Sequence, residues 1–347
     1  MEENKSIYGS SLLVPSVQEL VKKEANLTVP SRYVRANQDP ILFSSQLCSP
    51  QIPVIDLQKL ISVESAASEF ENLHSACKDW DPLGLGVTEG MLVNHEVSSS
   101  LVEKIKTDIQ EFFNLPMEEK KKFWQNSGEV EGFGQAFVVS EQQKLDWNDI
   151  FLMTTLPVHM RKPHLFPKLP SPFRILEQME KALKVKAKEV TELFEGGLQA
   201  MRMNYYPPCP EPEQVIGLAP HSDAAGLTIL LQVSEVEGLQ IKKDGMWAPV
   251  KPLPNAFIVN IGDFLEIITN GEYRSIEHRV TINSSDKERL SIATFYSPRF
   301  DGEMGPAYSL VNDQSPQKYR RIGVQEFYRD FFKRELDGKS FIDSMRL

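Results

Sequence analysis

Residues 239–250 have the sequence LQIKKDGMWAPV, in which two short alternating runs flank an Asp-Gly pair. Asp244-Gly245 in this setting is a strong signal for a tight β-hairpin, because both residue types tolerate the positive φ angles of a two-residue turn. The stretch therefore predicts two antiparallel strands, at Leu239–Lys242 and Trp247–Val250.

Similar short runs continue on both sides of this hairpin, from Leu198 to Ser297. They alternate or are rich in β-branched residues, and turn residues separate them, which is the pattern of an antiparallel sandwich or barrel. Further strands are predicted at Ala200–Tyr206, Leu227–Val233, Ala256–Asn260, Ser275–Ile282 and Arg289–Ser297. We therefore expect a core of two β-sheets in this part of the chain.

The N-terminal half is dominated by helical patterns instead. Ser100 and Glu103 have the spacing of a capping box that would begin a helix with one apolar face. Other helices are predicted at Ser62–Trp80 and Val324–Arg334, and N-terminal strands at Ile52–Leu57, Met91–Asn94 and Ile150–Thr155. The predicted organisation is a helical N-terminal region (1–197), a β core (198–300) and a C-terminal helical lid (301–347).

The composition is typical of a soluble globular protein, and we expect its partner to be a small-molecule substrate. The 347 residues carry a net charge of −10, which argues against a nucleic-acid partner because such a partner needs a dominant basic face. No apolar run approaches the ~18 residues of a membrane span, and the N-terminus lacks the features of a secretory signal. Cys48, Cys77 and Cys209 are too scattered for a disulfide framework. We expect a cytoplasmic monomer that does not bind membranes.

Two histidines and a carboxylate in the β region form a candidate metal site. His221 and Asp223 are two residues apart in an extended segment, so their side chains point to the same side. His278 lies on the apolar, inward face of its predicted strand. Two histidines and one carboxylate form the facial triad of non-haem Fe(II) oxygenases, which leaves positions open for co-substrate and O2. An exposed turn after Pro220 and an ordinary core histidine are the alternative interpretations.

Arg289 and Ser291 form a second candidate site, on a strand face that they share with Ala293 and Phe295. A buried arginine needs an anionic partner, and no acidic residue shares this face. A small dicarboxylate would supply that partner, held by a bidentate clamp and a hydrogen bond from the hydroxyl. Such a clamp argues against a zinc hydrolase built on the same triad. An acidic residue from another strand is the alternative partner.

The segment NYYPPCP, residues 204–210, ends a predicted strand with polar side chains and continues with rigid prolines. Asn204 and Tyr206 are two residues apart, so both would face the same cavity as the candidate clamp. The alternative is an aromatic core strand that leads into a stiff loop.

These motifs together resemble the plant 2-oxoglutarate- and Fe(II)-dependent dioxygenases, over nearly the whole chain. The matching segments are Asn204–Pro210, His221–Asp223, Glu237–Gln240, Asn260–Asp263, His278–Arg279 and Arg289–Ser291. Val14–Leu20, Phe112–Leu115 and Leu336–Phe341 are similar to the senescence-related group, close to the codeine and thebaine O-demethylases. The resemblance implies a double-stranded β-helix (jelly-roll, cupin-like) core flanked by α-helices.

The resemblance also implies the cofactors and the residues that hold them. Fe(II) would be bound by His221, Asp223 and His278. The co-substrate 2-oxoglutarate would be held at its distal carboxylate by Arg289 and Ser291, and near its metal-chelating end by Asn204 and Tyr206. O2 would be the oxidant and ascorbate the reductant.

For the organic substrate, the resemblance implies that Phe295 faces it and that Phe133 forms the opposite wall. A packed core position is the alternative for Phe295. The implied reaction hydroxylates or O-demethylates a small plant specialised metabolite, alkaloid- or flavonoid-like, with release of succinate and CO2.

The chain departs from the family pattern in two places. The segment Asp81–Gly90 replaces the expected sequence after Trp80, and Glu96 stands where a glycine is expected. After Arg174 roughly four turns of a helix are absent. We expect these changes to lower stability, and a non-catalytic or weakly active relative is the alternative hypothesis.

Overall fold

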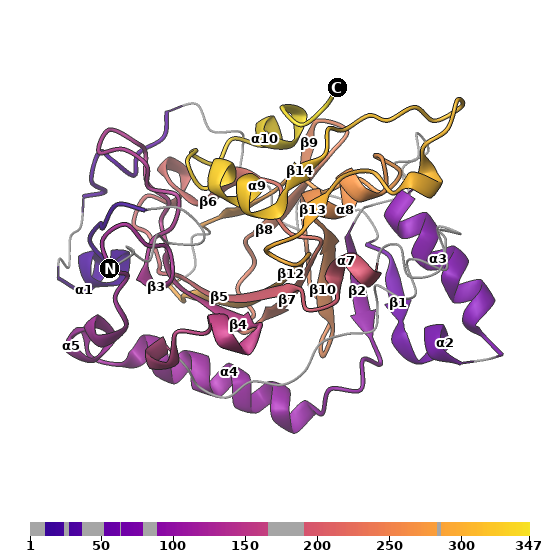
Figure 1. The fold of residues 1–347 in the computed structure, drawn as a ribbon. Helices are drawn as coiled ribbons and strands as arrows, with labels where there is room; N and C mark the ends of the chain where they lie inside the picture. The colour runs from indigo at the N-terminus through magenta and orange to yellow at the C-terminus, as the bar shows by residue number, and fades with distance from the viewer. Residues whose placement is uncertain are drawn as a thin grey trace.

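The computed structural model describes residues 11–23, 28–36, 52–62, 64–78, 89–165, 191–282 and 286–347. Two β-sheets form its centre (Figure 1). The larger sheet has eight strands in the order β1-β2-β10-β7-β12-β5-β4-β3, and the smaller has four in the order β6-β11-β8-β9. Within these sheets β1 and β2 pair in parallel, and the other neighbours pair antiparallel.

The chain alternates between the two sheets, which is the connectivity of a jelly roll. The larger sheet contains β1 (Val54–Asp56), β2 (Glu89–Val93), β3 (Gly132–Gly134), β4 (Asp149–Leu156), β5 (Leu198–Tyr206), β7 (Leu227–Gln232), β10 (Phe257–Ile261) and β12 (Arg289–Ser297). The smaller contains β6 (Ile216–His221), β8 (Leu239–Lys243), β9 (Met246–Pro249) and β11 (His278–Thr281). Successive strands from β5 to β7 and from β10 to β12 change sheet at each step. The predicted double-stranded β-helix core is therefore confirmed.

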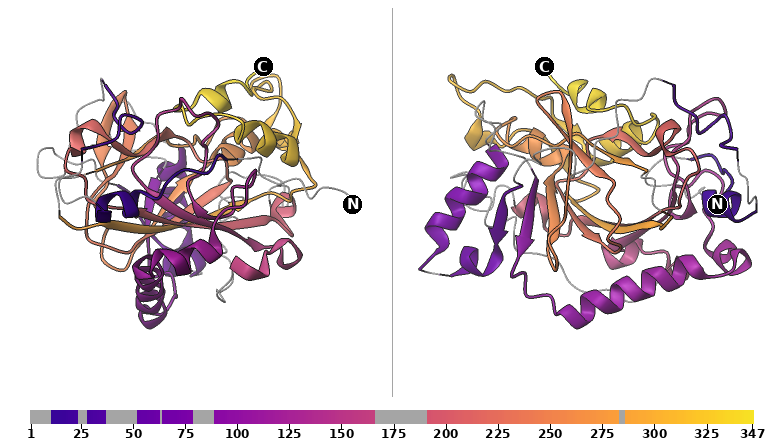
Figure 2. Two further views of the ribbon diagram at one scale, coloured as in Figure 1. Left: turned by 90° about the vertical axis from the view of Figure 1, so that its left-hand side faces the viewer. Right: turned by 180° about the vertical axis from the view of Figure 1, so that it is seen from behind.

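Helices cover the outside of the sheets. They are α1 (Val17–Lys23), α2 (Leu57–Ile61), α3 (Ala66–Lys78), α4 (Ser99–Asn114), α5 (Met117–Lys120), α7 (Thr191–Phe194), α8 (Asp263–Ile268), α9 (Val324–Phe331) and α10 (Ser340–Asp343). In Figures 1 and 2, α4 runs along the outside of the larger sheet, while α9 and α10 lie on the opposite side of the core. A separate short pair, β13 (Glu303–Met304) and β14 (Ile322–Gly323), leads into α9.

The hairpin and the longest predicted strand agree with the structure. Asp244 and Gly245 have φ angles of 50° and 77°, and they connect β8 to β9 as an antiparallel pair. β12 has the predicted bounds, Arg289–Ser297. Four strands, β3, β6, β13 and β14, were not predicted. β3 is short and rich in glycine, β6 ends in a Pro-His pair, and β13 and β14 have two residues each.

The predicted capping box at Ser100 and Glu103 is wrong. The N-cap of α4 is Ser98, whose hydroxyl accepts a hydrogen bond from the backbone N–H of Leu101 at 3.3 Å. Glu103 does not reach back to the cap, because its carboxylate accepts a hydrogen bond of 2.9 Å from Lys106 within the helix. Ser100 lies inside the first turn.

Of the departures from the family pattern, residues 81–88 and the segment after Arg174 lie outside the described residues. Glu96 is described and has a φ of 62°. This left-handed conformation favours glycine, which explains physically why a glycine is expected at this position.

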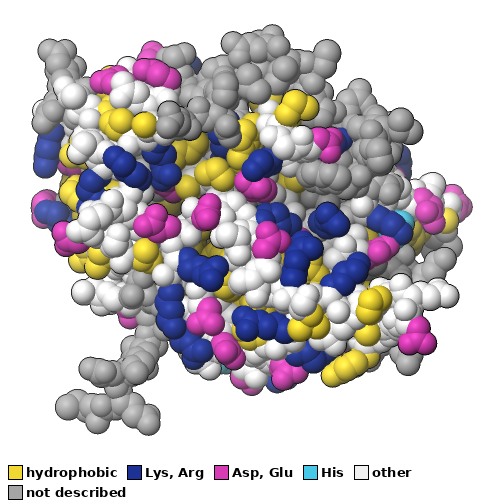
Figure 3. Space-filling view, turned by 90° about the horizontal axis from the view of Figure 1, so that it is seen from above, with side chains coloured by type: hydrophobic (Ala, Val, Ile, Leu, Met, Phe, Trp, Pro, Cys, Tyr) yellow, Lys and Arg dark blue, Asp and Glu magenta, His cyan; other side chains and the backbone are white. Residues whose placement is uncertain are grey.

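The described residues give three further observations. No helix in the described part of the chain is long and apolar enough to cross a membrane. On the face shown in Figure 3, basic and acidic side chains are interspersed. Cys77 and Cys209 are free and buried.

Candidate metal centre

His221, Asp223 and His278 meet at one end of the smaller sheet. His221 is the last residue of β6 and lies directly opposite His278, the first residue of β11, with the ring centroids 4.2 Å apart. Asp223 follows β6 by two residues. One potential ligand atom from each of the three side chains lies within 4.8 Å of the others. The structure thus brings together the three residues that the sequence pattern grouped.

The carboxylate of Asp223 is held in a fixed orientation. Its Oδ2 accepts hydrogen bonds from the hydroxyl of Thr228 at 2.6 Å and from the amide of Asn260 at 2.9 Å. Its Oδ1 lies 3.5 Å from Nε2 of His221 and 3.7 Å from Nε2 of His278. One oxygen is therefore fixed by the protein, and the other faces both imidazoles.

The loop that carries Asp223 packs tightly against Gly262. A Cβ atom at Gly262 would lie 2.2 Å from the carbonyl oxygen of Ala225 and 2.9 Å from that of Asp223. The N–H of Asp263 also donates a hydrogen bond of 2.8 Å to the carbonyl of Asp223. Close backbone approach therefore requires glycine here and fixes the position of the loop.

Hydrogen bonds at the far ring nitrogens orient both histidines. Nδ1 of His221 lies 2.8 Å from the carbonyl of Ala219, and Nδ1 of His278 lies 3.2 Å from that of Ile276. Carbonyl oxygens only accept, so each Nδ1 carries the proton and each Nε2 presents a lone pair. Nε2 of His221 is buried without a hydrogen-bond partner among the described residues.

The electrostatics of the cluster keep these groups ready to bind a cation. Burial and then the neighbouring His221 lower the pKa of His278 to about 4, so its imidazole is neutral near neutral pH. Burial alone would raise the pKa of Asp223, but the two imidazoles and its hydrogen bonds hold that pKa well below its ordinary range. Two imidazole nitrogens with one carboxylate fit divalent iron.

A second group of predicted residues meets between β5 and β12. Arg289 lies directly opposite Tyr206, and Ser291 lies opposite Asn204. The amide of Asn204 donates a hydrogen bond of 3.2 Å to the hydroxyl of Ser291. The guanidinium carbon of Arg289 lies 5.2 Å from the ring centroid of Tyr206.

Arg289 is only 3% exposed, and its charge lacks a carboxylate partner among the described residues. Its guanidinium donates to Ser291 at 3.4 Å and to Oε1 of Gln232 at 3.3 Å, while its Nε is buried and unpartnered. Oδ1 of Asn204 is also buried and unpartnered. A buried cation with a free donor is suited to an anionic ligand such as a carboxylate.

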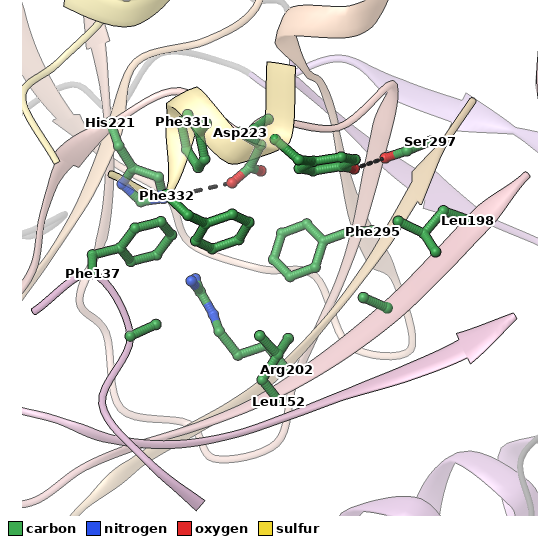
Figure 4. Close-up of a pocket in the computed structure, with 14 residues that line it drawn as sticks. Phe137, Leu152, Leu198, Arg202, His221, Asp223, Phe295, Ser297, Phe331 and Phe332 are labelled. Carbon is green, nitrogen blue, oxygen red and sulfur yellow. Dashed lines mark hydrogen bonds and ion pairs between the residues drawn. The ribbon is translucent and has the colours of Figure 1, made fainter. Parts of the chain in front are cut away.

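An aromatic cavity opens beside the histidines and encloses about 620 Å³, its open mouth included. His221 and Asp223 line it, and its aromatic walls are Phe137, Phe295, Tyr328, Phe331 and Phe332 (Figure 4). Three of these aromatic residues come from the segment at and after α9. The C-terminal segment therefore closes one side of the cavity.

The structure places Phe295 in this cavity but not Phe133. Phe133 is fully buried and packs in an aromatic cluster with Phe112 and Phe113 of α4. Its side chain therefore contacts the helix that covers the outside of the larger sheet. Phe137, four residues later, lines the cavity.

Arg202 lines the same cavity and was not singled out from the sequence. Its position could have been found from the alternation of side chains along a strand. Every second residue of β5 faces the same side, which places Arg202 with Ala200, Asn204 and Tyr206. A charged residue on this inward face indicates a buried charge that needs a partner, as was argued for Arg289 on β12. The aromatic residues of α9 carried no comparable signal, because a helix places such residues in a core as readily as in a cavity.

The chain matches two protein-family models. Residues 197–298 match the 2OG-Fe(II) oxygenase superfamily. Residues 52–169 match the N-terminal region of the non-haem dioxygenases in morphine synthesis.

Similar proteins cover nearly the whole chain. Protein SRG1 of Arabidopsis thaliana is 54% identical over 100% of both chains. The oxoglutarate-dependent flavonoid 7-O-demethylase 1 of Ocimum basilicum is 51% identical over 100% of this chain and 94% of its own. Codeine O-demethylase of Papaver somniferum is 50% identical over 98% of both.

The match to Protein SRG1 extends over 366 positions, 19 more than the 347 residues of this chain, so the relative has residues without a counterpart here. This difference agrees with the expected shortening of the chain. Among solved structures, the crystal structure of JOX2 in complex with 2OG, Fe and JA has a TM-score of 0.81 and 33% identity. It covers 96% of this chain and 98% of its own.

Proposed function

The chain belongs to the 2OG-Fe(II) oxygenase superfamily, and from this premise we propose that it removes methyl groups from the oxygen atoms of small aromatic plant metabolites. The family consists of oxidoreductases that use Fe(II), 2-oxoglutarate and O2. The alternative hypothesis of a non-catalytic relative has no support in the comparisons or in the described residues.

His221, Asp223 and His278 are the proposed iron ligands. The Nε2 of His221, which lacks a hydrogen-bond partner, supports this assignment, as does Oδ1 of Asp223, which faces both imidazoles. Thr228 and Asn260 hold the carboxylate in place from outside, as outer hydrogen bonds commonly do at metal sites.

Arg289 and Ser291 are proposed to bind the distal carboxylate of 2-oxoglutarate, with Asn204 and Tyr206 beside it. The unpaired charge of Arg289 supports this role, because a carboxylate would neutralise it. When bound, iron, 2-oxoglutarate and O2 supply the oxidation, in which 2-oxoglutarate gives succinate and CO2 and a substrate C–H bond gains an oxygen atom.

The aromatic cavity is proposed to hold the organic substrate. Its phenylalanine side chains favour a flat aromatic body, exclude water and direct one end of the substrate toward His221 and Asp223. If that end is a methoxy group, hydroxylation gives a hemiacetal, which breaks into formaldehyde and a free hydroxyl group. The flavonoid and codeine O-demethylases at about half identity support this reaction.

The single observation that carries the proposal is the opening of the histidine–aspartate cluster into this cavity. A substrate bound against Phe295 would therefore lie beside the proposed iron site.

A screen of methylated flavonoids and benzylisoquinoline alkaloids tests the reaction. Formaldehyde and succinate should appear in equal amounts with at least one substrate, only when 2-oxoglutarate is present, and not with His278→Ala. Succinate formed together with a hydroxylated product that retains its methyl group would contradict demethylation.

A further inference from the structure

A buried ion pair fastens the C-terminal tail, residues 337–347, to the core. Nζ of Lys339 donates hydrogen bonds of 2.6 Å to Oε2 of Glu266 on α8 and of 2.8 Å to the carbonyl of Ser275. The side chain of Glu266 is fully buried, and that of Lys339 is mostly buried. The tail therefore carries a positive charge into the interior, where a carboxylate receives it.

The carboxylate of Glu266 is ionised and is held from several sides. Burial alone would raise its pKa, but the charge of Lys339 and the hydrogen bonds lower that pKa below its ordinary value. Its Oε1 accepts a hydrogen bond of 2.7 Å from the hydroxyl of Tyr319, and its Oε2 accepts one of 2.8 Å from the N–H of Ser275. Arg346 lies 3.5 Å away but is half exposed, so water screens its charge. Lys339 is therefore the main counter-charge of this carboxylate.

The surroundings of this ion pair are fixed relative to the proposed iron site. The N–H of Gly338 donates a hydrogen bond of 2.8 Å to the carbonyl of Pro220, and Gly338 forms a parallel bridge with His221. α8 begins with Asp263, whose N–H donates to the carbonyl of Asp223. Both sides of the ion pair thus contact backbone next to or within the proposed iron ligands.

Phe341 connects the ion pair to the wall of the aromatic cavity. It lies two residues beyond Lys339, and its ring centroid is 4.8 Å from that of Phe327 and 5.3 Å from that of Phe331. Both of these residues belong to α9, and Phe331 lines the cavity. Figure 1 shows α10, which contains Phe341, next to α9. Release of Lys339 would therefore withdraw part of the support of α9.

We propose, on the basis of the proposed function, that Lys339 is a positioning residue for the organic substrate. Its ion pair with Glu266 holds Phe341 against α9, and α9 in turn holds Phe331 at the cavity wall. A wall fixed in this way excludes water and binds a flat aromatic ring without first having to be ordered. Loss of the ion pair should loosen the wall and weaken substrate binding. The iron and 2-oxoglutarate sites should remain intact, because β-strands carry them.

Hydrogen–deuterium exchange of the protein loaded with Fe(II) and 2-oxoglutarate, measured without oxygen, tests whether Lys339 holds the wall. Lys339→Met keeps most of the length of the side chain and removes its charge. We expect it to speed exchange of the backbone N–H groups of α9 at least tenfold and to leave β5 and β12 unchanged. Lys339→Arg keeps the charge and should restore most of the protection.

Two further variants serve as controls. Lys333→Met changes an exposed lysine two residues beyond α9, which pairs with Asp330 at 3.5 Å, and it should leave the exchange unchanged. Lys339→Met combined with Glu266→Gln leaves no buried carboxylate without its counter-charge. It should show the same faster exchange of α9 as Lys339→Met, which separates the lost connection from the cost of a buried charge.

A double-mutant cycle tests whether Lys339 acts through Phe341. Phe341→Leu removes the aromatic contact with α9 and should by itself speed the exchange of α9. Combined with Lys339→Met, it should add no more than about twofold to the faster single variant, because both changes break the same connection. Rate increases that multiply would show that the two residues act independently, which contradicts the inference.

The affinity for aromatic ethers tests the consequence for substrate binding. The probes are 7-methoxyflavone and papaverine, one from each class of the proposed screen, and they are titrated without oxygen into the loaded protein. Lys339→Met should weaken the binding of whichever probe the wild-type protein binds by at least fivefold. Its affinities for Fe(II) and 2-oxoglutarate should stay within twofold of the wild-type values.

The outcomes distinguish this inference from the proposed function. Unchanged exchange of α9 in Lys339→Met would overturn the inference, as would an equal increase in α9, β5 and β12, which indicates a global loss of stability. Unchanged probe affinity together with faster exchange would also overturn it. If the wild-type protein bound neither 2-oxoglutarate nor a probe, the proposed function would be wrong, and the exchange of α9 would still decide whether Lys339 holds the wall.

Discussion

Thr228 donates a hydrogen bond of 2.6 Å to Oδ2 of Asp223, the carboxylate whose other oxygen faces both imidazoles of the proposed iron site. Thr228 lies on β7 and Asn260, the second donor, lies on β10. Both strands belong to the larger sheet, whereas the two histidines lie on strands of the smaller sheet. The proposed iron site is therefore assembled across the two sheets, with Asp223 as the connection.

Thr228→Val tests this connection, because valine keeps the shape of threonine and removes the hydroxyl donor. We expect about a tenfold loss of Fe(II) affinity, since Asn260 still holds the carboxylate. Thr294→Val, the same change on β12, serves as the control and should leave Fe(II) affinity unchanged. Equal affinities of the two variants would show that Thr228 does not orient Asp223.

Arg289→Lys should weaken 2-oxoglutarate binding far more than it changes Fe(II) binding. Lysine keeps the positive charge but cannot form the paired hydrogen bonds of a guanidinium with a carboxylate. Titration of 2-oxoglutarate into the Fe(II)-loaded protein measures this effect. If the affinity is the same as in the wild-type protein, Arg289 has a structural role and the carboxylate binds elsewhere.

Glu96→Gly should stabilise the protein. Glu96 has a φ of 62°, and a left-handed conformation costs a residue with a Cβ atom roughly 1–2 kcal/mol. The greater freedom of glycine in the unfolded chain offsets part of this gain, so we expect a net increase of about 0.5–1 kcal/mol in the free energy of unfolding.

Asn255→Gly is the matched control, because Asn255 has a φ of 56° but asparagine tolerates this region. Its effect on the free energy of unfolding should be smaller than that of Glu96→Gly. Denaturant titration of both variants measures the difference. A destabilised Glu96→Gly protein would mean that the glutamate side chain makes a favourable contact that outweighs the strain.

The shortened segment after Arg174 should lower stability. A helix that covers a β core buries several large apolar side chains, and each contributes about 1.5–3 kcal/mol to stability. The free energy of unfolding of a whole domain is only about 5–15 kcal/mol. Replacing the segment by its longer counterpart from Protein SRG1 should raise the melting temperature. Fe(II) and 2-oxoglutarate should raise the melting temperature of the wild-type protein part of the way to that of the lengthened variant, because they bind the native state. Equal melting temperatures would show that the shortening is accommodated.

The β core could be predicted from the sequence because its signals are local. Asp244-Gly245 fixes a turn through its own backbone preferences, and β12 begins with alternating polar and apolar residues, Arg289 to Ile292. The N-cap of α4 was less accessible, since three consecutive serines, 98 to 100, could each have begun the helix. The structure has Ser98 as the N-cap.

Some residues of the proposed site could likewise be predicted from local sequence, whereas others could not. The alternation of side chains along strands brought His221 and Asp223 together and placed Asn204 and Tyr206 on one face. The same alternation could have identified Arg202, which our sequence analysis did not single out. By contrast, Phe331 and Phe332 reach the cavity from the C-terminal end of α9, so their position depends on how the C-terminal segment packs.

The most direct test of the central claim compares the wild-type protein with His221→Ala, Asp223→Ala and His278→Ala. Without oxygen, Fe(II) and 2-oxoglutarate should give the wild-type protein a metal-to-ligand charge-transfer absorption band, and admission of air should then produce succinate in step with product. Each alanine variant should retain no iron and show no band, because two protein ligands cannot outcompete water. Stoichiometric iron binding and an unchanged band in any one of these variants would contradict the assignment of the three residues as the iron site.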